Sequence, residues 1–141
     1  GDLDLSKRDD KSFILEILVH SADIANPCRT ESIYRKWTDR VMEEFYKQGD
    51  LERDREMTIT NFFDRESPNV PKCQIGFINF VVLPLFNVVS EVLGSPSHSP
   101  LSCLTLAQHS QLIDLPDLMR NIKANLAAMQ AEETAPPPSK I

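Results

Sequence analysis

The sequence predicts an all-α protein. Apolar residues recur at helical spacing through most of its 141 residues. In addition, Pro27, Pro71 and Pro116 lie where this spacing ends or begins, as is typical of helix boundaries. The length suits one domain with a core of its own.

The first helix is predicted over residues 10–24. Its apolar face consists of Phe13, Ile14, Ile17, Leu18 and Ile24. Pro27 ends it, because the residue before a proline is disfavoured in the α region.

The second helix begins after Thr30, which we expect to cap it. A four-residue repeat predicts that one stripe of this helix belongs to the core, and the stripe consists of Ile33, Trp37, Val41 and Phe45. Gly49 is the predicted stop, since glycine commonly follows the last helical turn. Residues 50–57 are mostly charged and are predicted to form a solvated helical turn.

A loop over 58–69 precedes a third helix, which starts at Pro71 and runs to about residue 93 with a kink at Pro84. Its apolar run, 75–86, is about twelve residues long, whereas a membrane span needs about twenty. We therefore expect a buried helix and no membrane span. A divergent linker over 94–113 leads to a last helix after Asp114, and residues 134–141 are predicted to be a disordered tail.

Composition excludes some classes of function. The net charge of −6 argues against a nucleic-acid partner, which normally requires a basic face. The acidic, polar first ten residues do not resemble a signal peptide. Three unevenly spaced cysteines fit neither a disulfide framework nor a zinc cluster. A reduced, intracellular protein of the cytoplasm is the simplest expectation.

Three polar residues are candidates for chemistry. Asp23 ends an apolar helix, where a carboxylate is costly unless it is paired or bound to a metal. The commoner alternative is a residue that faces solvent at the helix end. Gln74 shares a helix face with Phe77, and an amide beside an aromatic ring suits a planar ligand. The alternative is a polar first-turn residue beside a core phenylalanine. His20 is a possible metal ligand or acid, but a structural role is commoner.

Three motifs considered together resemble one family. They are His-Ser-Ala-Asp-Ile-Ala-Asn-Pro (20–27), the segment from Tyr34 to Asp50, and Cys-Gln-Ile-Gly-Phe-Ile (73–78). In order and spacing they resemble class I 3′,5′-cyclic nucleotide phosphodiesterases, most of all the cAMP-specific subfamily. The match covers residues 10–93. It implies that residues 1–133 are the C-terminal portion of a multi-helix, HD-type catalytic domain.

The resemblance also implies roles for individual residues. Asp23 matches a catalytic carboxylate that binds metal. The substrate-binding positions are Asn26, Tyr34, Val41, Phe45, Gln74 and Phe77. Among these, Gln74 and Asn26 match residues that meet the purine edge, and Tyr34 matches a neighbour that orients the glutamine. Val41 and Phe77 match the two sides that sandwich the base, and Phe45 lines the same pocket.

The implied reaction is hydrolysis of a 3′,5′-cyclic nucleotide, with cAMP favoured, to the 5′-monophosphate. Two divalent metals, zinc together with magnesium or manganese, would activate the phosphate and a hydroxide. The other protein ligands of the family and its general acid lie upstream of the matching region. We therefore expect this chain alone to hold no metal pair and to be inactive without the missing N-terminal half. The alternative is a non-catalytic, truncated helical module with a regulatory or interaction role.

Overall fold

The computed structural model describes residues 6–94 and 114–136. Its elements are α1 (Arg8–Asp23), the 3-10 turn η1 (Asn26–Cys28), α2 (Glu31–Asp54), α3 (Val70–Phe77), the π-helical turn η2 (Ile78–Val82), α4 (Leu83–Gly94) and α6 (Leu115–Thr134). The absence of strands within these ranges confirms the predicted all-α class. The predicted linker, apart from Gly94, and residues 137–141 of the predicted tail lie outside the described residues.

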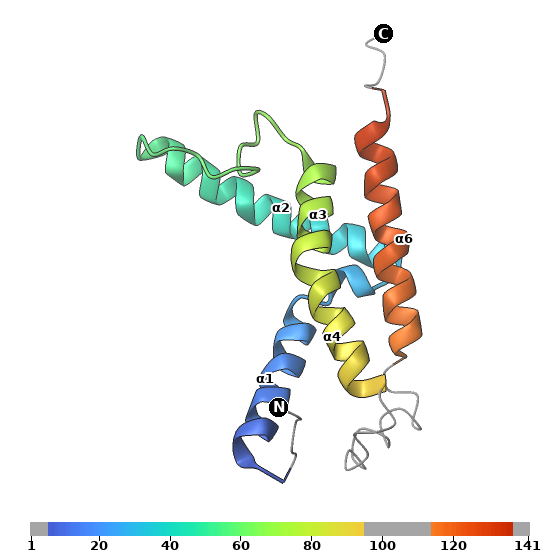
Figure 1. Ribbon diagram of the computed structural model, residues 1–141. Coiled ribbons are helices and arrows are strands. Elements are labelled where there is room, and N and C mark those ends of the chain that lie inside the picture. Colours follow the sequence, from blue (N-terminus) through green and yellow to red (C-terminus); the bar gives the residue numbers. More distant parts are fainter. Residues whose placement is uncertain (1–5, 95–113, 137–141) are drawn as a thin grey trace.

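One long helical column organises the molecule. The segments α3, η2 and α4 follow one another without a loop, and α6 packs beside them (Figure 1). α1 contacts α4, while α2 contacts both η1 and α6. The core lies where these elements meet, and its buried apolar residues are Cys28, Tyr34, Ile78, Val82, Phe86, Ile122 and Met129.

The predicted apolar face of α1 is mostly buried or half-buried, since Ile17, Leu18 and Ile24 are all half-buried. Ile14 is buried, but Phe13 is 53% exposed. Val19, which lies outside that predicted face, is 70% exposed. The periodicity therefore identified both the helix and most of its covered face, with Phe13 as the exception.

The predicted core stripe of α2 is wrong by one position. Ile33 and Trp37 are 44% and 48% exposed, whereas the buried side chains on this helix are those of Tyr34, Thr38 and Met42. The buried face is partly polar, so a search for apolar repeats selects the adjacent stripe instead.

Two boundary predictions for α2 are also wrong in detail. Thr30 occupies the N-cap position, but its side chain makes no capping hydrogen bond. Gly49 does not stop the helix, which continues to Asp54. A Cβ at position 49 would lie 2.0 Å from the backbone oxygen of Phe63. The glycine therefore permits the following loop to lie directly on the helix.

The start of α3 agrees with the predicted one. Pro71 lies in the first turn, and the Asn69 side chain caps the helix by accepting a 3.0 Å hydrogen bond from the Lys72 N–H. Before Pro84 the helix widens into the π-helical turn η2 rather than continuing as a regular α-helix. Proline lacks an N–H and its ring crowds the carbonyl one turn earlier, so a local widening of the helix relieves this conflict.

The expectation of no membrane span rested on a short apolar run, and the structure makes the corresponding helix longer. Val70–Glu91 forms 22 continuous helical residues with a hydropathy of 1.7 over its most apolar window, which suffices for a span by length and composition alone. A core helix meets the same criterion, so this is weak evidence. Ile78, Val82 and Phe86 on this helix are buried in the core, and 28% of the apolar window is buried by the described residues.

Candidate functional site

A buried hydrogen bond joins α2 to α3. The hydroxyl of Tyr34 donates to the Gln74 Oε1 atom over 3.0 Å, and the hydroxyl of Thr38 lies 3.5 Å from the same oxygen. Tyr34 is 0% and Gln74 3% exposed. Because an amide is planar, two donors at Oε1 fix the direction of the Nε2 amino group as well.

The environment keeps Tyr34 a donor. Burial raises the pKa of its phenol from 10.0 to about 12, although the hydrogen bond with Thr38 and the nearby Arg35 act in the opposite direction. The phenol therefore retains its proton at neutral pH. Gln74 thus has a defined amide orientation over the whole physiological pH range.

Asn26 lies on the short turn η1 between α1 and α2. Its Oδ1 atom is buried and makes no hydrogen bond with the described residues. A buried carbonyl oxygen without a donor is uncommon, because it loses its hydration without compensation. The atom is therefore a candidate acceptor for a ligand.

Phe45, on α2, stacks against Phe63 from the loop that follows. The ring centroids are 4.3 Å apart and the planes differ by 11°. Phe45 and Val41 are both half-buried and lie one helical turn apart. The arrangement presents an apolar wall on α2 in the same helix that carries Tyr34.

Polar contacts attach this loop to α2. Glu52 accepts hydrogen bonds from both the N–H and the hydroxyl of Thr60, over 2.7 and 2.8 Å. Arg53 pairs with Asp64 over 2.6 Å. Arg65 reaches back to Asp50 over 2.8 Å. Hence the Phe45–Phe63 stack belongs to a loop that is held at several points.

Asp23 lies apart from these groups, on the exposed last turn of α1. It borders an open groove along that helix together with Leu15, Glu16, Val19 and His20. In the described part of the chain, no three His, Cys, Asp or Glu side chains come together as a metal site would need. The described residues therefore do not fit a metal pair by themselves.

Phe77 is half-buried at the end of α3 and packs against the core cluster. It lies one helical turn after Gln74. The structure thus brings Tyr34, Thr38 and Gln74 into direct contact and holds Phe45 against Phe63. No described contact joins Asp23 to any of them.

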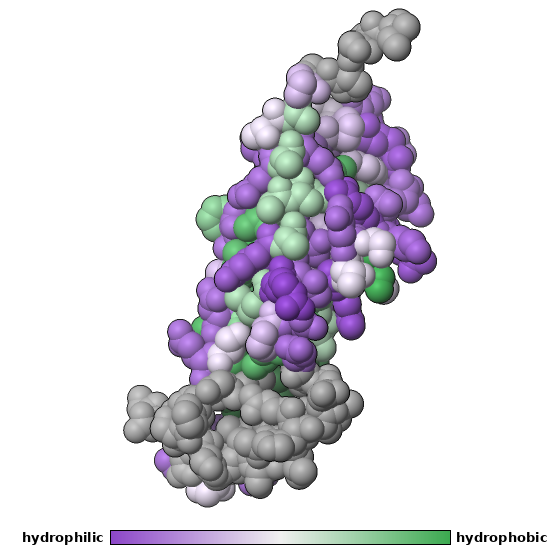
Figure 2. Space-filling model, turned by 90° about the vertical axis from the view of Figure 1, so that its right-hand side faces the viewer, coloured by the Kyte–Doolittle hydropathy of each residue, from purple (hydrophilic) through white to green (hydrophobic). Residues whose placement is uncertain are grey.

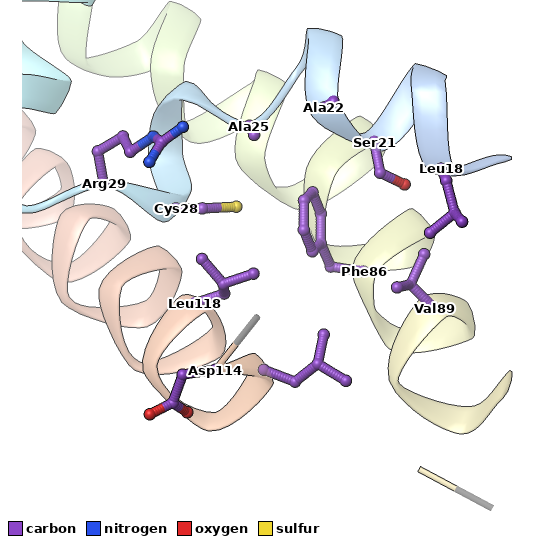
Figure 3. Close-up of a pocket in the computed structure, with 11 residues that line it drawn as sticks. Leu18, Ser21, Ala22, Ala25, Cys28, Arg29, Phe86, Val89, Asp114 and Leu118 are labelled. Carbon is purple, nitrogen blue, oxygen red and sulfur yellow. The ribbon is translucent and has the colours of Figure 1, made fainter. Parts of the chain in front are cut away.

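A partly open hollow of about 280 Å³ lies elsewhere, between α1, η1, α4 and α6. Leu18, Phe86, Val89 and Leu118 point into it, as do Ser21 and Cys28 (Figure 3). None of the predicted site residues lines it. Burial raises the pKa of the Cys28 thiol from 9.0 to about 12, so this cysteine is a poor nucleophile.

Sequence reasoning missed three kinds of contact. Thr38 follows Tyr34 by one helical turn, so its position on the same face was a usable signal. Phe63 had no such signal, because its partner depends on the course of a loop. Asn121 and Asn125 of α6 donate hydrogen bonds to the η1 turn across more than ninety positions of sequence, and no local pattern indicates that pairing.

Comparisons with known proteins indicate the family and the fold of the chain. The family model described as 3'5'-cyclic nucleotide phosphodiesterase matches residues 2–103. The "3',5'-cyclic-AMP phosphodiesterase 4" of Dictyostelium discoideum is 41% identical over 86 residues, which cover 61% of this chain and 8% of that protein. The solved structure of LmjPDEB1 in complex with IBMX, from Leishmania, shares the fold with a TM-score of 0.72 and 23% identity. That superposition covers 94% of this chain and 34% of LmjPDEB1, so the chain spans a small part of each relative.

Proposed function

The chain belongs to the 3'5'-cyclic nucleotide phosphodiesterase family, and we propose that it supplies the base-binding part of an enzyme that hydrolyses a cyclic nucleotide to its 5′-monophosphate. The observation that carries this proposal is the orientation of the Gln74 amide by Tyr34 and Thr38. A buried amide with a fixed direction can read the hydrogen-bonding edge of a purine.

We favour cAMP as the substrate. The relative from Dictyostelium discoideum is described as a 3',5'-cyclic-AMP phosphodiesterase. Asn26 adds an unpaired buried acceptor, Oδ1, on the turn that precedes α2. The exocyclic amino group of adenine is a donor, which suits such an acceptor.

The apolar sides of the proposed base site are Val41, Phe45 and Phe77. Stacking on aromatic and branched side chains suits a flat heterocycle. The Phe63 ring stacks on Phe45 and so restricts the movement of this wall.

The catalytic centre requires more protein than this chain. We propose that Asp23 binds one metal of a zinc and magnesium or manganese pair in the complete enzyme, where those metals would polarise the phosphate and activate water. Its partners would come from the N-terminal half of the catalytic domain. The two similar proteins are both much longer than the match.

Exposed apolar side chains support an extensive contact with that half. Among the described residues, the exposed large apolar side chains lie on α1, α2, the loop after α2, η2 and α4, whereas none lies on α6. They include Leu15 at 62%, Val19 at 70% and Phe80 at 83%. The face on the α6 side is instead mainly hydrophilic, with one narrow apolar strip (Figure 2). Unpartnered apolar patches of this kind mark interaction surfaces.

The test is hydrolysis of cAMP and cGMP by the native gene product that carries this segment. We expect metal-dependent hydrolysis with a preference for cAMP. Gln74→Ala should raise KM about tenfold or more, since a lost hydrogen bond to a substrate edge has effects of that size. Gln48→Ala is the matched control, because Gln48 is an exposed amide on α2. Absence of hydrolysis would instead favour the non-catalytic interaction module.

A further inference from the structure

Three successive backbone carbonyl groups of the η1 region accept hydrogen bonds from α6. The Asn125 Nδ2 atom donates to the oxygens of Pro27 and Arg29, both over 2.9 Å. The Asn121 Nδ2 atom donates to the oxygen of Cys28 over 3.0 Å. Two asparagines one helical turn apart therefore donate hydrogen bonds to all three of these carbonyl groups.

The turn needs these donors because it is too short to satisfy itself. A helix continues by donating later N–H groups to earlier carbonyls, but η1 has three residues and the chain is extended at Arg29, with φ −86° and ψ 163°. Pro27 and Cys28 are buried, so water does not replace the missing donors. Unpaired carbonyls in this position would be costly.

Asn125 is suited to this task in particular. It is 1% exposed, and both hydrogens of one amide nitrogen are used, on carbonyls that flank Cys28. The amide therefore bridges the turn from one end to the other. An aspartate has the same shape but no N–H, so it would place a negative charge beside two carbonyl oxygens.

The same helix also contacts the other elements of the proposed base site. α6 packs against α3, which carries Gln74, and Glu132 of α6 pairs with Arg35 of α2. Yet α6 lies beyond residues 2–103, to which the family model extends. The contacts of α6 with the other elements therefore indicate its role.

We propose that Asn125, assisted by Asn121, is a positioning residue for the nucleotide site. The two amides fix the η1 turn and thereby the place of Asn26 on it. This inference rests on the proposed function for its kinetic consequence, but the fixing of the turn is measurable without any activity.

The first experiment measures hydrogen–deuterium exchange in the native gene product. Cys28 and Arg29 donate backbone hydrogen bonds within the turn, over 3.0 and 3.1 Å. Asn125→Asp should accelerate exchange over residues 26–30 by about tenfold or more relative to α3. The variant lacks the hydrogen bonds from Asn125 to the turn, so the turn can open locally at a lower free-energy cost. Gln130→Glu, an equivalent change at an exposed position of α6, should have no such effect.

Asn121→Ala provides the milder variant if the buried aspartate prevents folding. It removes one of the three bonds and should still accelerate exchange over residues 26–30 more than over α3. The proposal is overturned if exchange in this segment matches that of Gln130→Glu, or if all segments accelerate equally in Asn121→Ala.

The second experiment is kinetic and separates positioning from general stability. Asn121→Ala should raise KM for the cyclic nucleotide about threefold to tenfold while kcat changes less than twofold, since only base binding is disturbed. In an Asn26→Ala background the same substitution should have little further effect, because residues that act through one another are not additive. Full additivity would overturn the functional part. If the wild-type protein hydrolyses no cyclic nucleotide, the proposed function fails, and exchange still decides whether the turn is fixed.

Discussion

The Tyr34 hydroxyl donates a hydrogen bond to Gln74 Oε1 over 3.0 Å across forty positions of sequence, at a place that is closed to solvent. The bond couples α2 to α3 and sets the direction of the amide. A stable orientation of this kind is what a hydrogen-bonding readout of a ligand edge requires.

Removing that donor should cost stability. Tyr34→Phe leaves the Gln74 oxygen buried with only the more distant Thr38 hydroxyl, so we expect a loss of about 1–3 kcal/mol in the free energy of unfolding. Urea denaturation followed by circular dichroism measures it. Thr38→Val is the comparison, and a cost for that variant equal to or above that of Tyr34→Phe would contradict the assigned donor.

Replacement of two helical glycines by alanine should change the stability of the protein in opposite directions. Gly49→Ala should destabilise the protein by about 1–3 kcal/mol or more, because the new Cβ meets the backbone of Phe63. Gly76→Ala should stabilise it by about 0.5–1 kcal/mol, since nothing lies within 4 Å of its Cβ and alanine favours the helix. Thermal melting of both variants is the measurement. Stabilisation by Gly49→Ala would show that the loop does not lie on α2.

The Phe45–Phe63 stack should show as a coupling energy. Phe45→Leu, Phe63→Leu and the double variant form a cycle, for which we expect an interaction of about 0.5–1.5 kcal/mol. The free energies of unfolding from denaturant titration provide the values. Additive effects would mean that the two rings do not support each other.

Stability should fall at alkaline pH. The pKa of Cys28 rises from 9.0 to about 12 on folding and that of Tyr34 from 10.0 to about 12, each chiefly through burial. Between about pH 9 and 12 the unfolded chain has lost protons that the native protein still holds. The free energy of unfolding then decreases with pH, by up to about 1.4 kcal/mol per pH unit for each group.

Below about pH 9 both groups are protonated in either state and contribute no slope. Unfolding titrations at pH 8, 9 and 10 test this, and Cys28→Ala should make the decline between pH 9 and 10 shallower. A decline that is unchanged in this variant would rule out the contribution of the thiol.

The isolated chain should not hydrolyse cAMP in the presence of Mg²⁺ or Mn²⁺. Asp23 is exposed, and the described residues bring no three metal-binding side chains together. A coupled assay for the 5′-monophosphate, with an active phosphodiesterase as positive control, is sufficient. Turnover that disappears in Asp23→Asn would refute the expectation.

The sequence alone determined the class of fold and the family. Periodicity placed the main helices, because the apolar residues of a helix that buries one face must recur at helical spacing. Pro71 and Pro116 located two helix starts, since the effect of proline acts within one turn. The structure adds side-chain caps from Asn69 and Asp114. The three motifs identified the family that the comparison then confirmed. The roles of the individual site residues remain predictions.

Tertiary structure decided which faces are buried and which side chains meet. The α2 face that is buried carries Tyr34 and Thr38, because their hydroxyl groups find a partner in Gln74 and can therefore leave water. Gly49 continues a helix where the local rule predicts a stop, because a loop lies directly against it. Asn125 holds a turn almost one hundred positions away. Each of these outcomes depends on contacts between distant segments, which local periodicity and propensity do not encode.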